Sequence, residues 1–167
     1  DIFLIYGFLN HNFKWMMKKE LRKFPFVGIA CAKARQIFVD RSTPGHIKET
    51  IDHARETLQH GISLVVFPEG SRTFTGHMGT FRKGAFLLAD ELQLPVVPIT
   101  INGPFDALPR MKKLNFVNRV PLSMTIHRPI YPQGEGRTDI KLLSRESKAV
   151  IMAGLVEKYR DLSDKNK

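Results

Sequence analysis

Residues 44–67 constrain the fold more than any other part of the sequence. Apolar residues recur there at spacings of four, three and four, which predicts a helix with one apolar face. These residues are Ile47, Ile51, Ala54 and Leu58. Gly61 ends the helix, and residues 62–67 form a β-branched apolar run typical of a buried strand. A helix that leads into a buried strand indicates an α/β fold.

The rest of the chain continues this alternation. We expect further strands at 13–17, 36–39, 96–101 and 122–126, and further helices at 24–33, 83–92 and 140–159. The apolar segment 2–9 fits either a buried helix or a strand. A length of 167 residues fits one domain. The prediction is therefore a single α/β domain over 1–167, with a mixed, mostly parallel β-sheet flanked by helices, completed by the strand at 122–126 and followed by a polar tail at 160–167.

The charge of the chain favours an anionic partner. The chain has 26 Lys and Arg residues against 16 Asp and Glu, a formal net charge of +10. Nucleic acid, a membrane surface and a phosphorylated small molecule all fit that charge. No run approaches the roughly 18 apolar residues of a membrane span. The single cysteine, Cys31, excludes an internal disulfide framework.

The most specific string in the sequence is Phe67-Pro68-Glu69-Gly70-Ser71-Arg72-Thr73. It follows the buried strand directly, at the edge of the sheet where α/β proteins place their sites. Gly70 lets the backbone approach a ligand closely, and Arg72 offers a two-pronged donor for phosphate. A tight turn with a surface Glu–Arg pair is the structural alternative. Arg41 also follows a predicted strand, so two arginines could converge on one anion or simply be solvated.

These strings resemble the glycerolipid acyltransferase family, and within it the 1-acylglycerol-3-phosphate acyltransferases. Residues 67–72 match the family's third block, Phe-Pro-Glu-Gly-Thr-Arg, with Ser71 in place of Thr. Residues 38–41 match the end of its second block, although Arg35 stands where the family has Gly. Val97-Pro98-Ile99 resembles the fourth block, and Phe81-Arg82-Lys83-Gly84-Ala85 resembles the start of the following helix. The resemblance makes Lys83 and Pro98 candidate substrate-binding residues.

The family's first block, His-x-x-x-x-Asp, carries the chemistry. Asp1-Ile2-Phe3 resembles the Asp of that block and the residues after it. The resemblance implies that Asp1 orients a His five positions upstream, outside this sequence, and that this His acts as general base. We therefore expect a domain truncated at its N-terminus, whose exact chain lacks the base for activity. His11 is no substitute, because Met16 and not Asp stands five residues after it.

The resemblance implies transfer of a fatty acyl group from acyl-CoA or acyl-carrier protein to the free hydroxyl of 1-acylglycerol-3-phosphate, giving phosphatidic acid. Arg41 and Arg72 would hold the phosphate of this lysophospholipid, within a site that also includes Glu69, Gly70 and Ser71. No cofactor is expected beyond the acyl thioester cosubstrate, and no metal. His46, His53 and His60 share a helix face, but successive ones lie about 10 Å apart, too far to share one metal.

The stretch 13–26 interleaves aromatic and basic residues. We expect Trp15, Phe24 and Phe26 to enter a lipid interface while the basic residues contact anionic headgroups. This places the protein at the cytoplasmic face of the membrane, as a peripheral protein or anchored by an upstream segment. A core strand and helix with a basic outer face is the structural alternative, and aromatic residues among basic ones also suit single-stranded nucleic acid.

Three other functions stay open. One is acyl transfer to another acceptor, such as glycerol-3-phosphate or a lyso-aminolipid. Another is a family member without catalysis that binds lipid or a protein partner. The third is a basic nucleic-acid-binding module, but no motif that reads a groove occurs in the sequence, so no nucleic acid is expected as partner.

Overall fold

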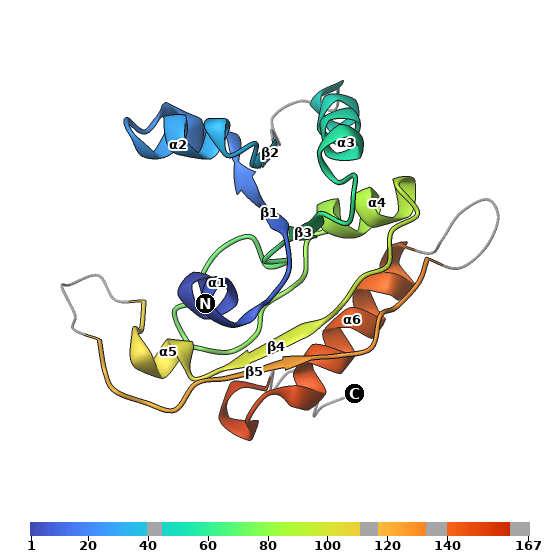
Figure 1. Cartoon of the computed structure of the whole chain (residues 1–167). Helices are drawn as coiled ribbons and strands as arrows, with labels where there is room; N and C mark the ends of the chain where they lie inside the picture. Colours follow the sequence, from blue (N-terminus) through green and yellow to red (C-terminus); the bar gives the residue numbers. More distant parts are fainter. Residues whose placement is uncertain (40–44, 111–116, 133–139, 161–167) are drawn as a thin grey trace. The chain divides into compact units, whose positions relative to one another are not determined.

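The computed structural model describes residues 1–39, 45–110, 117–132 and 140–160 (Figure 1). The chain divides into two compact units. One unit is Phe8–Phe67, and the other combines Asp1–Gly7 with Pro68–Lys167. Each unit is described here by itself.

The unit Phe8–Phe67 contains a parallel three-stranded sheet. Its elements are β1 (Phe13–Lys18), η1 (Lys19–Lys23), α2 (Val27–Lys33), β2 (Ile37–Val39), α3 (Gly45–Thr57) and β3 (Ser63–Val65). The strand order is β2-β1-β3, with β1 in the middle. Its first half pairs with β3, where Phe13 lies opposite Ser63, and its second half pairs with β2, where Met16 lies opposite Ile37. The predicted helix and strand in residues 44–67 are thus confirmed as α3 and β3.

Trp15 is central to the core of this unit. Its side chain is only 6% exposed, and its ring stacks on Phe67 with centroids 5.4 Å apart. Its backbone N–H donates to the side-chain oxygen of Gln36 over 2.6 Å, which links β1 to the residue before β2. The expectation that Trp15 enters a lipid interface is therefore wrong. In the middle strand of the sheet, Trp15 is buried and the other apolar residues of β1 are partly buried, whatever basic residues flank them.

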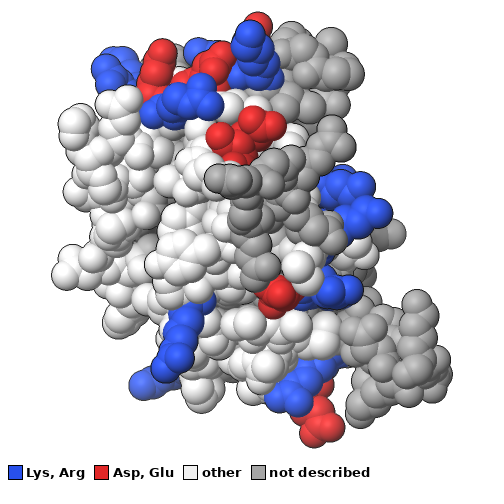
Figure 2. Space-filling view, turned by 90° about the vertical axis from the view of Figure 1, so that its right-hand side faces the viewer, with Lys and Arg blue, Asp and Glu red and all other residues white. Residues whose placement is uncertain are grey.

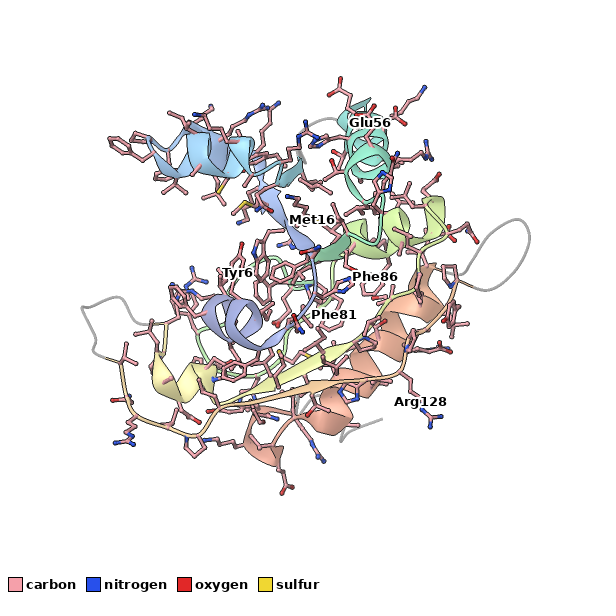
Figure 3. All side chains as sticks on the ribbon, in the orientation of Figure 1. Tyr6, Met16, Glu56, Phe81, Phe86 and Arg128 are labelled. Carbon is pink, nitrogen blue, oxygen red and sulfur yellow. The ribbon has the colours of Figure 1, made fainter. Side chains whose placement is uncertain are left out.

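The second unit is built on an antiparallel strand pair. Its elements are α1 (Ile2–Phe8), α4 (Gly84–Glu91), β4 (Ile99–Asn102), α5 (Pro104–Ala107), β5 (Ser123–Ile126), α6 (Ile140–Gly154) and η2 (Glu157–Tyr159). Figure 1 shows α6 running along the β4–β5 pair. The apolar core of this unit consists of Met78, Phe81, Phe86 and Leu143. The rings of Phe81 and Phe86 stack with centroids 6.1 Å apart (Figure 3).

The predicted α/β class, with parallel strands and flanking helices, is confirmed. The strand expected at 122–126 does form, as β5, but it does not complete the parallel sheet. It pairs antiparallel with β4, so that Ile99 lies opposite Ile126 and Asn102 opposite Ser123. Each of the two strands pairs with the other along one edge, and together they form a separate two-stranded sheet.

Two further boundaries differ from expectation. The last helix ends at Gly154, five residues before the predicted end, and the turn η2 follows. The apolar segment 2–9 is the helix α1, but only Ile5 is buried in it, and Phe3 is 91% exposed. The assignment of 1–167 to one domain stays a prediction, and the polar tail from residue 161 lies outside the described residues. Within the ranges given above, no helix combines the length and apolar character needed to cross a membrane.

The positive charge is distributed rather than concentrated on the face shown in Figure 2. Lysine and arginine side chains stand there in separate groups, several of them beside acidic side chains. Among the described residues on that face, the charge therefore does not form the continuous basic stripe that tracks a nucleic-acid backbone.

Candidate functional site

The loop at residues 68–82 carries the most specific sequence motif, and the structure closes it on itself. The backbone N–H of Arg82 donates to the carbonyl of Pro68 over 2.8 Å. Gly70 has a φ of 73°, in the left-handed region where glycine carries no steric cost. The turn after Gly70 brings Ser71 and Arg72 out of the loop, and both are exposed.

Glu69 faces into this loop. Its Oε2 accepts a hydrogen bond from the backbone N–H of Gly79 over 2.7 Å, and its carbonyl accepts one from Arg82 Nε over 3.2 Å. A carboxylate that accepts a backbone N–H holds the two ends of the loop together with a charge-assisted bond. Glu69 thus shapes the loop. This contact lies ten residues away in sequence and differs from the surface Glu–Arg pair of the structural alternative.

The middle of the loop is organised by threonine hydroxyls. Thr73 Oγ1 accepts a hydrogen bond from the backbone N–H of Thr75 over 3.1 Å, and Thr75 Oγ1 accepts one from the N–H of His77 over 3.3 Å. These are side-chain turns that fix backbone without a strand partner. The hydroxyl of Thr73 therefore already has a role within the loop.

The C-terminal turn η2 holds the far end of the loop. The backbone N–H of Met78 donates to the carbonyl of Tyr159 over 3.4 Å, and His77 Nδ1 lies 3.2 Å from the carbonyl oxygen of Arg160. Tyr159 is buried and packs edge-to-face on Phe105, with centroids 6.0 Å apart. His77 is thus hydrogen-bonded and half-buried.

Asp1 and Arg72 belong to the same compact unit, which combines the segment 1–7 with the segment 68–167. They are 71 positions apart in sequence, yet the fold places both in this unit. The residue that matches the family's first block and the arginine of its third block therefore share one unit.

The other predicted site residues lie as follows. Arg41 lies outside the described residues, so its convergence with Arg72 stays a prediction. Lys83 is exposed directly before α4. Pro98 is buried, and its carbonyl accepts a hydrogen bond from the backbone N–H of His127 over 3.0 Å, in the strand pairing next to β4. A role for Lys83 and Pro98 in substrate binding likewise stays a prediction.

Arg110 is a residue of this region that sequence reasoning did not connect with it. Its Nη1 donates to the carbonyl oxygen of Arg72, and its guanidinium lies over the ring of Phe74, 3.9 Å from the centroid. Arg110 belongs to a basic cluster with Lys112 and Lys113 in the sequence, which gave no indication of this contact. In the part of the chain that the structure describes, no group of three or more His, Cys, Asp or Glu side chains is placed to hold a metal ion.

Comparisons with known proteins agree on one family. The family model described as Acyltransferase matches residues 1–102. The chain is 30% identical, over 131 residues, to a chloroplastic 1-acyl-sn-glycerol-3-phosphate acyltransferase of Brassica napus, covering 78% of this chain and 38% of the relative. It is 31% identical, over 159 residues, to the 1-acyl-sn-glycerol-3-phosphate acyltransferase of Pseudomonas aeruginosa, covering 94% of this chain and 60% of the relative.

A solved structure is similar as well. The crystal structure of the 1-acyl-sn-glycerophosphate acyltransferase PlsC from Thermotoga maritima matches with a TM-score of 0.69 and 28% identity. The match covers 92% of this chain and 59% of that protein. The chain thus spans less than two thirds of the length of each of these relatives.

Proposed function

The chain belongs to the acyltransferase family, and we propose on that basis that the whole protein acylates 1-acylglycerol-3-phosphate to phosphatidic acid. The acyl donor in this proposal is a thioester, acyl-CoA or acyl-carrier protein. The observation that carries the proposal is the closed loop at 68–82, which presents Arg72 as an exposed side chain in the same compact unit as Asp1. The names of the relatives indicate the same acceptor.

Arg72 has the chemistry to hold the phosphate of the acceptor. A guanidinium donates two parallel hydrogen bonds to phosphate oxygens and keeps its charge at every working pH. The side chain is exposed, whereas the loop beneath it is held by Glu69, Gly79 and Arg82. A fixed loop with an exposed cationic side chain at its turn suits a ligand that arrives from solvent or a lipid surface.

Asp1 fits the role of the residue that orients the base. In the proposed reaction, the acceptor hydroxyl loses its proton to a histidine as its oxygen bonds to the thioester carbonyl carbon. The carbon–sulfur bond then breaks, and the departing thiolate takes up the proton. A carboxylate beside the imidazole favours its charged form while it holds the proton. The block that Asp1 matches places that histidine five positions before it.

The phosphate role is tested with Arg72→Ala in the full-length protein, by measuring phosphatidic acid formation from lysophosphatidate and acyl-CoA. We expect the KM for lysophosphatidate to rise about tenfold or more, because a charge-assisted pair is lost. Arg128→Ala is the matched control, since it removes another exposed arginine of the same unit (Figure 3). An unchanged KM in Arg72→Ala contradicts the proposal.

The choice of acceptor is tested with a panel. Labelled lysophosphatidate is the acceptor, and each unlabelled acceptor is added as a competitor. Unlabelled lysophosphatidate should lower the formation of labelled product far more than glycerol-3-phosphate or a lyso-aminolipid does. If glycerol-3-phosphate is acylated in preference, the reaction class stands and the acceptor is corrected. The donor is tested in the same assay by offering acyl-CoA and acyl-carrier protein separately.

We also propose that the segment η1–α2 contacts an anionic membrane surface. Four large apolar side chains in or next to α2 are exposed by more than half: Phe24, Phe26, Val27 and Ile29. Exposed basic side chains accompany them: Lys18, Lys19, Arg22, Lys23 and Lys33. Apolar side chains flanked by basic ones are the pattern of a helix that lies in a lipid interface. A position on the cytoplasmic side of the membrane stays a prediction.

A further inference from the structure

We propose that Arg110 is a positioning residue that holds Arg72 in place for the acceptor phosphate. The proposal rests on the proposed function, since it assigns Arg110 to the turn that carries the phosphate-binding arginine. It goes beyond that function because the motif that defines the loop ends before Arg110, which lies 38 residues further along the chain.

Two contacts join Arg110 to this turn. Nη1 of Arg110 donates to the carbonyl oxygen of Arg72, which is the backbone of the phosphate-binding residue itself. The Cζ atom of Arg110 lies 3.9 Å from the ring centroid of Phe74, two residues further on. The planar guanidinium makes both contacts at once, because its edge donates hydrogen bonds while its face stacks on an aromatic ring.

Packing by itself does not explain the place of Phe74. Its side chain is 58% exposed, so the apolar core of the unit does not hold it. Arg110 is half-buried, which strengthens both contacts relative to those of a fully solvated side chain. Arg110 therefore supplies an anchor to a turn in which Ser71, Arg72 and Phe74 are exposed.

The anchor bears directly on the direction of the Arg72 side chain. A carbonyl oxygen fixed in space restricts ψ of its own residue, and hence the direction in which the Cα–Cβ bond points. The long side chain of Arg72 then needs to order only its own rotamers when phosphate binds. Since ordering a turn opposes binding, loss of the anchor weakens binding of the acceptor and leaves the acyl-transfer step itself unchanged.

A double-mutant cycle in the full-length protein tests this role. The variants are Arg110→Met, Arg72→Ala and the two combined, assayed with lysophosphatidate at saturating acyl-CoA. We expect Arg110→Met to raise the KM for lysophosphatidate about tenfold with kcat within about twofold. In the Arg72→Ala background, the same change should alter the KM less than about twofold, because Arg110 acts through Arg72.

The opposite results overturn the proposal. If the two single effects multiply in the double variant, Arg110 binds the phosphate independently of Arg72. An unchanged KM in Arg110→Met shows that the anchor is not needed. If Arg72→Ala itself leaves the KM for lysophosphatidate unchanged, the proposed phosphate role of Arg72 fails. The single variant shows that failure without the double variant, so the two failures are distinguishable.

Two matched variants separate geometry from charge. Arg110→Lys keeps the charge, but a compact ammonium cannot donate to Arg72 and stack on Phe74 together, so its KM should approach that of Arg110→Met. Phe74→Leu removes the ring and leaves Arg110 in place, and its KM should rise about threefold. Wild-type KM in Arg110→Lys contradicts the proposal.

Folding is followed by thermal melting for every variant. Arg128→Met is the control for removal of an arginine from this unit, because Arg128 is exposed and points away from the ribbon (Figure 3). Its KM should equal that of the wild type. If Arg110→Met melts below the assay temperature, Phe74→Leu and Arg110→Lys decide the question, with wild-type KM in both overturning it.

Discussion

The loop at 68–82 and the segment η1–α2 both follow a strand of the same parallel sheet, yet they are built in opposite ways. The loop bonds polar groups to its own backbone, where Glu69 accepts from the N–H of Gly79 and Thr73 accepts from the N–H of Thr75. The segment η1–α2 turns apolar side chains outward, with Phe26 85% exposed. The loop therefore suits an ionic ligand that needs fixed donors, whereas η1–α2 suits a partner that covers apolar surface.

The largest loss of stability is expected from a substitution of Gly28, where α2 packs against η1. The carbonyl oxygen of Arg22 occupies the space that a Cβ on Gly28 would need. Because backbone atoms cannot move aside as a flexible side chain can, Gly28→Ala should lower the free energy of unfolding by about 1–3 kcal/mol. Urea unfolding measures this loss.

Gly84→Ala is the matched control for that change. A Cβ on Gly84 meets nothing within 4 Å, at the start of α4. This variant should be neutral or more stable by up to about 1 kcal/mol, because alanine loses less backbone freedom on folding. If both variants lose equal stability, the close approach of α2 to η1 is not what holds the segment.

The next effect concerns the carboxylate that closes the loop. Glu69→Ala removes the acceptor of the Gly79 N–H, and should cost about 1–3 kcal/mol and raise the KM for lysophosphatidate. Glu69→Gln keeps a neutral acceptor of the same length, so it should retain most of the stability. Calorimetric melting and the acyltransfer assay measure the two. Equal losses in both variants would show that the charge, and not the loop closure, is what the protein needs.

Membrane contact by η1–α2 is tested with Phe26→Ser. Loss of an aromatic side chain that inserts into the lipid interface should weaken binding to vesicles of phosphatidylglycerol and phosphatidylcholine about tenfold, measured by co-sedimentation. The melting temperature should not fall, because Phe26 is exposed. Val117→Ser is the control, since Val117 is also exposed but lies outside the segment. Equal vesicle binding by wild type and Phe26→Ser contradicts the contact.

The smallest effect is expected at the ion pair of Asp106 and Lys158, whose charged atoms lie 2.7 Å apart. The hydrogen bond from Lys158 lowers the pKa of Asp106, and the bond to Asp106 raises the pKa of Lys158. The stabilisation from Asp106 is present above its ordinary pKa and is lost as pH falls through the lowered value. The stabilisation from Lys158 is present below its ordinary pKa and is lost as pH rises through the raised value.

Asp106→Asn should therefore lower the melting temperature slightly at neutral pH and not at all in strong acid. A scan of melting temperature against pH for both proteins measures this. Because Lys158 precedes Tyr159, which bonds the loop at Met78, the comparison also reports how firmly η2 holds the loop. A difference that persists unchanged into strong acid would assign the effect to packing instead.

Much of the local structure could be predicted because the signals are local. The helical spacing in 44–58 corresponds to α3, the apolar run after Gly61 to β3, and the glycine turn before Arg72 to an exposed loop. Periodicity and turn chemistry depend on residues that are close in sequence, so both can be recognised without knowledge of the tertiary structure. The resemblance to a family rested on the same short strings.

Only the tertiary structure decided where these pieces meet. It buried Trp15 against Phe67, although aromatic residues among lysines also fit a lipid-facing stretch. It paired β5 with β4 in a sheet of their own, because pairing depends on which strand edges remain open. It brought Arg110 to Arg72 across 38 residues, and a contact of that range leaves no periodic trace in the sequence. The residue types were thus determined locally, while the geometry of the loop arose from long-range hydrogen bonds and packing.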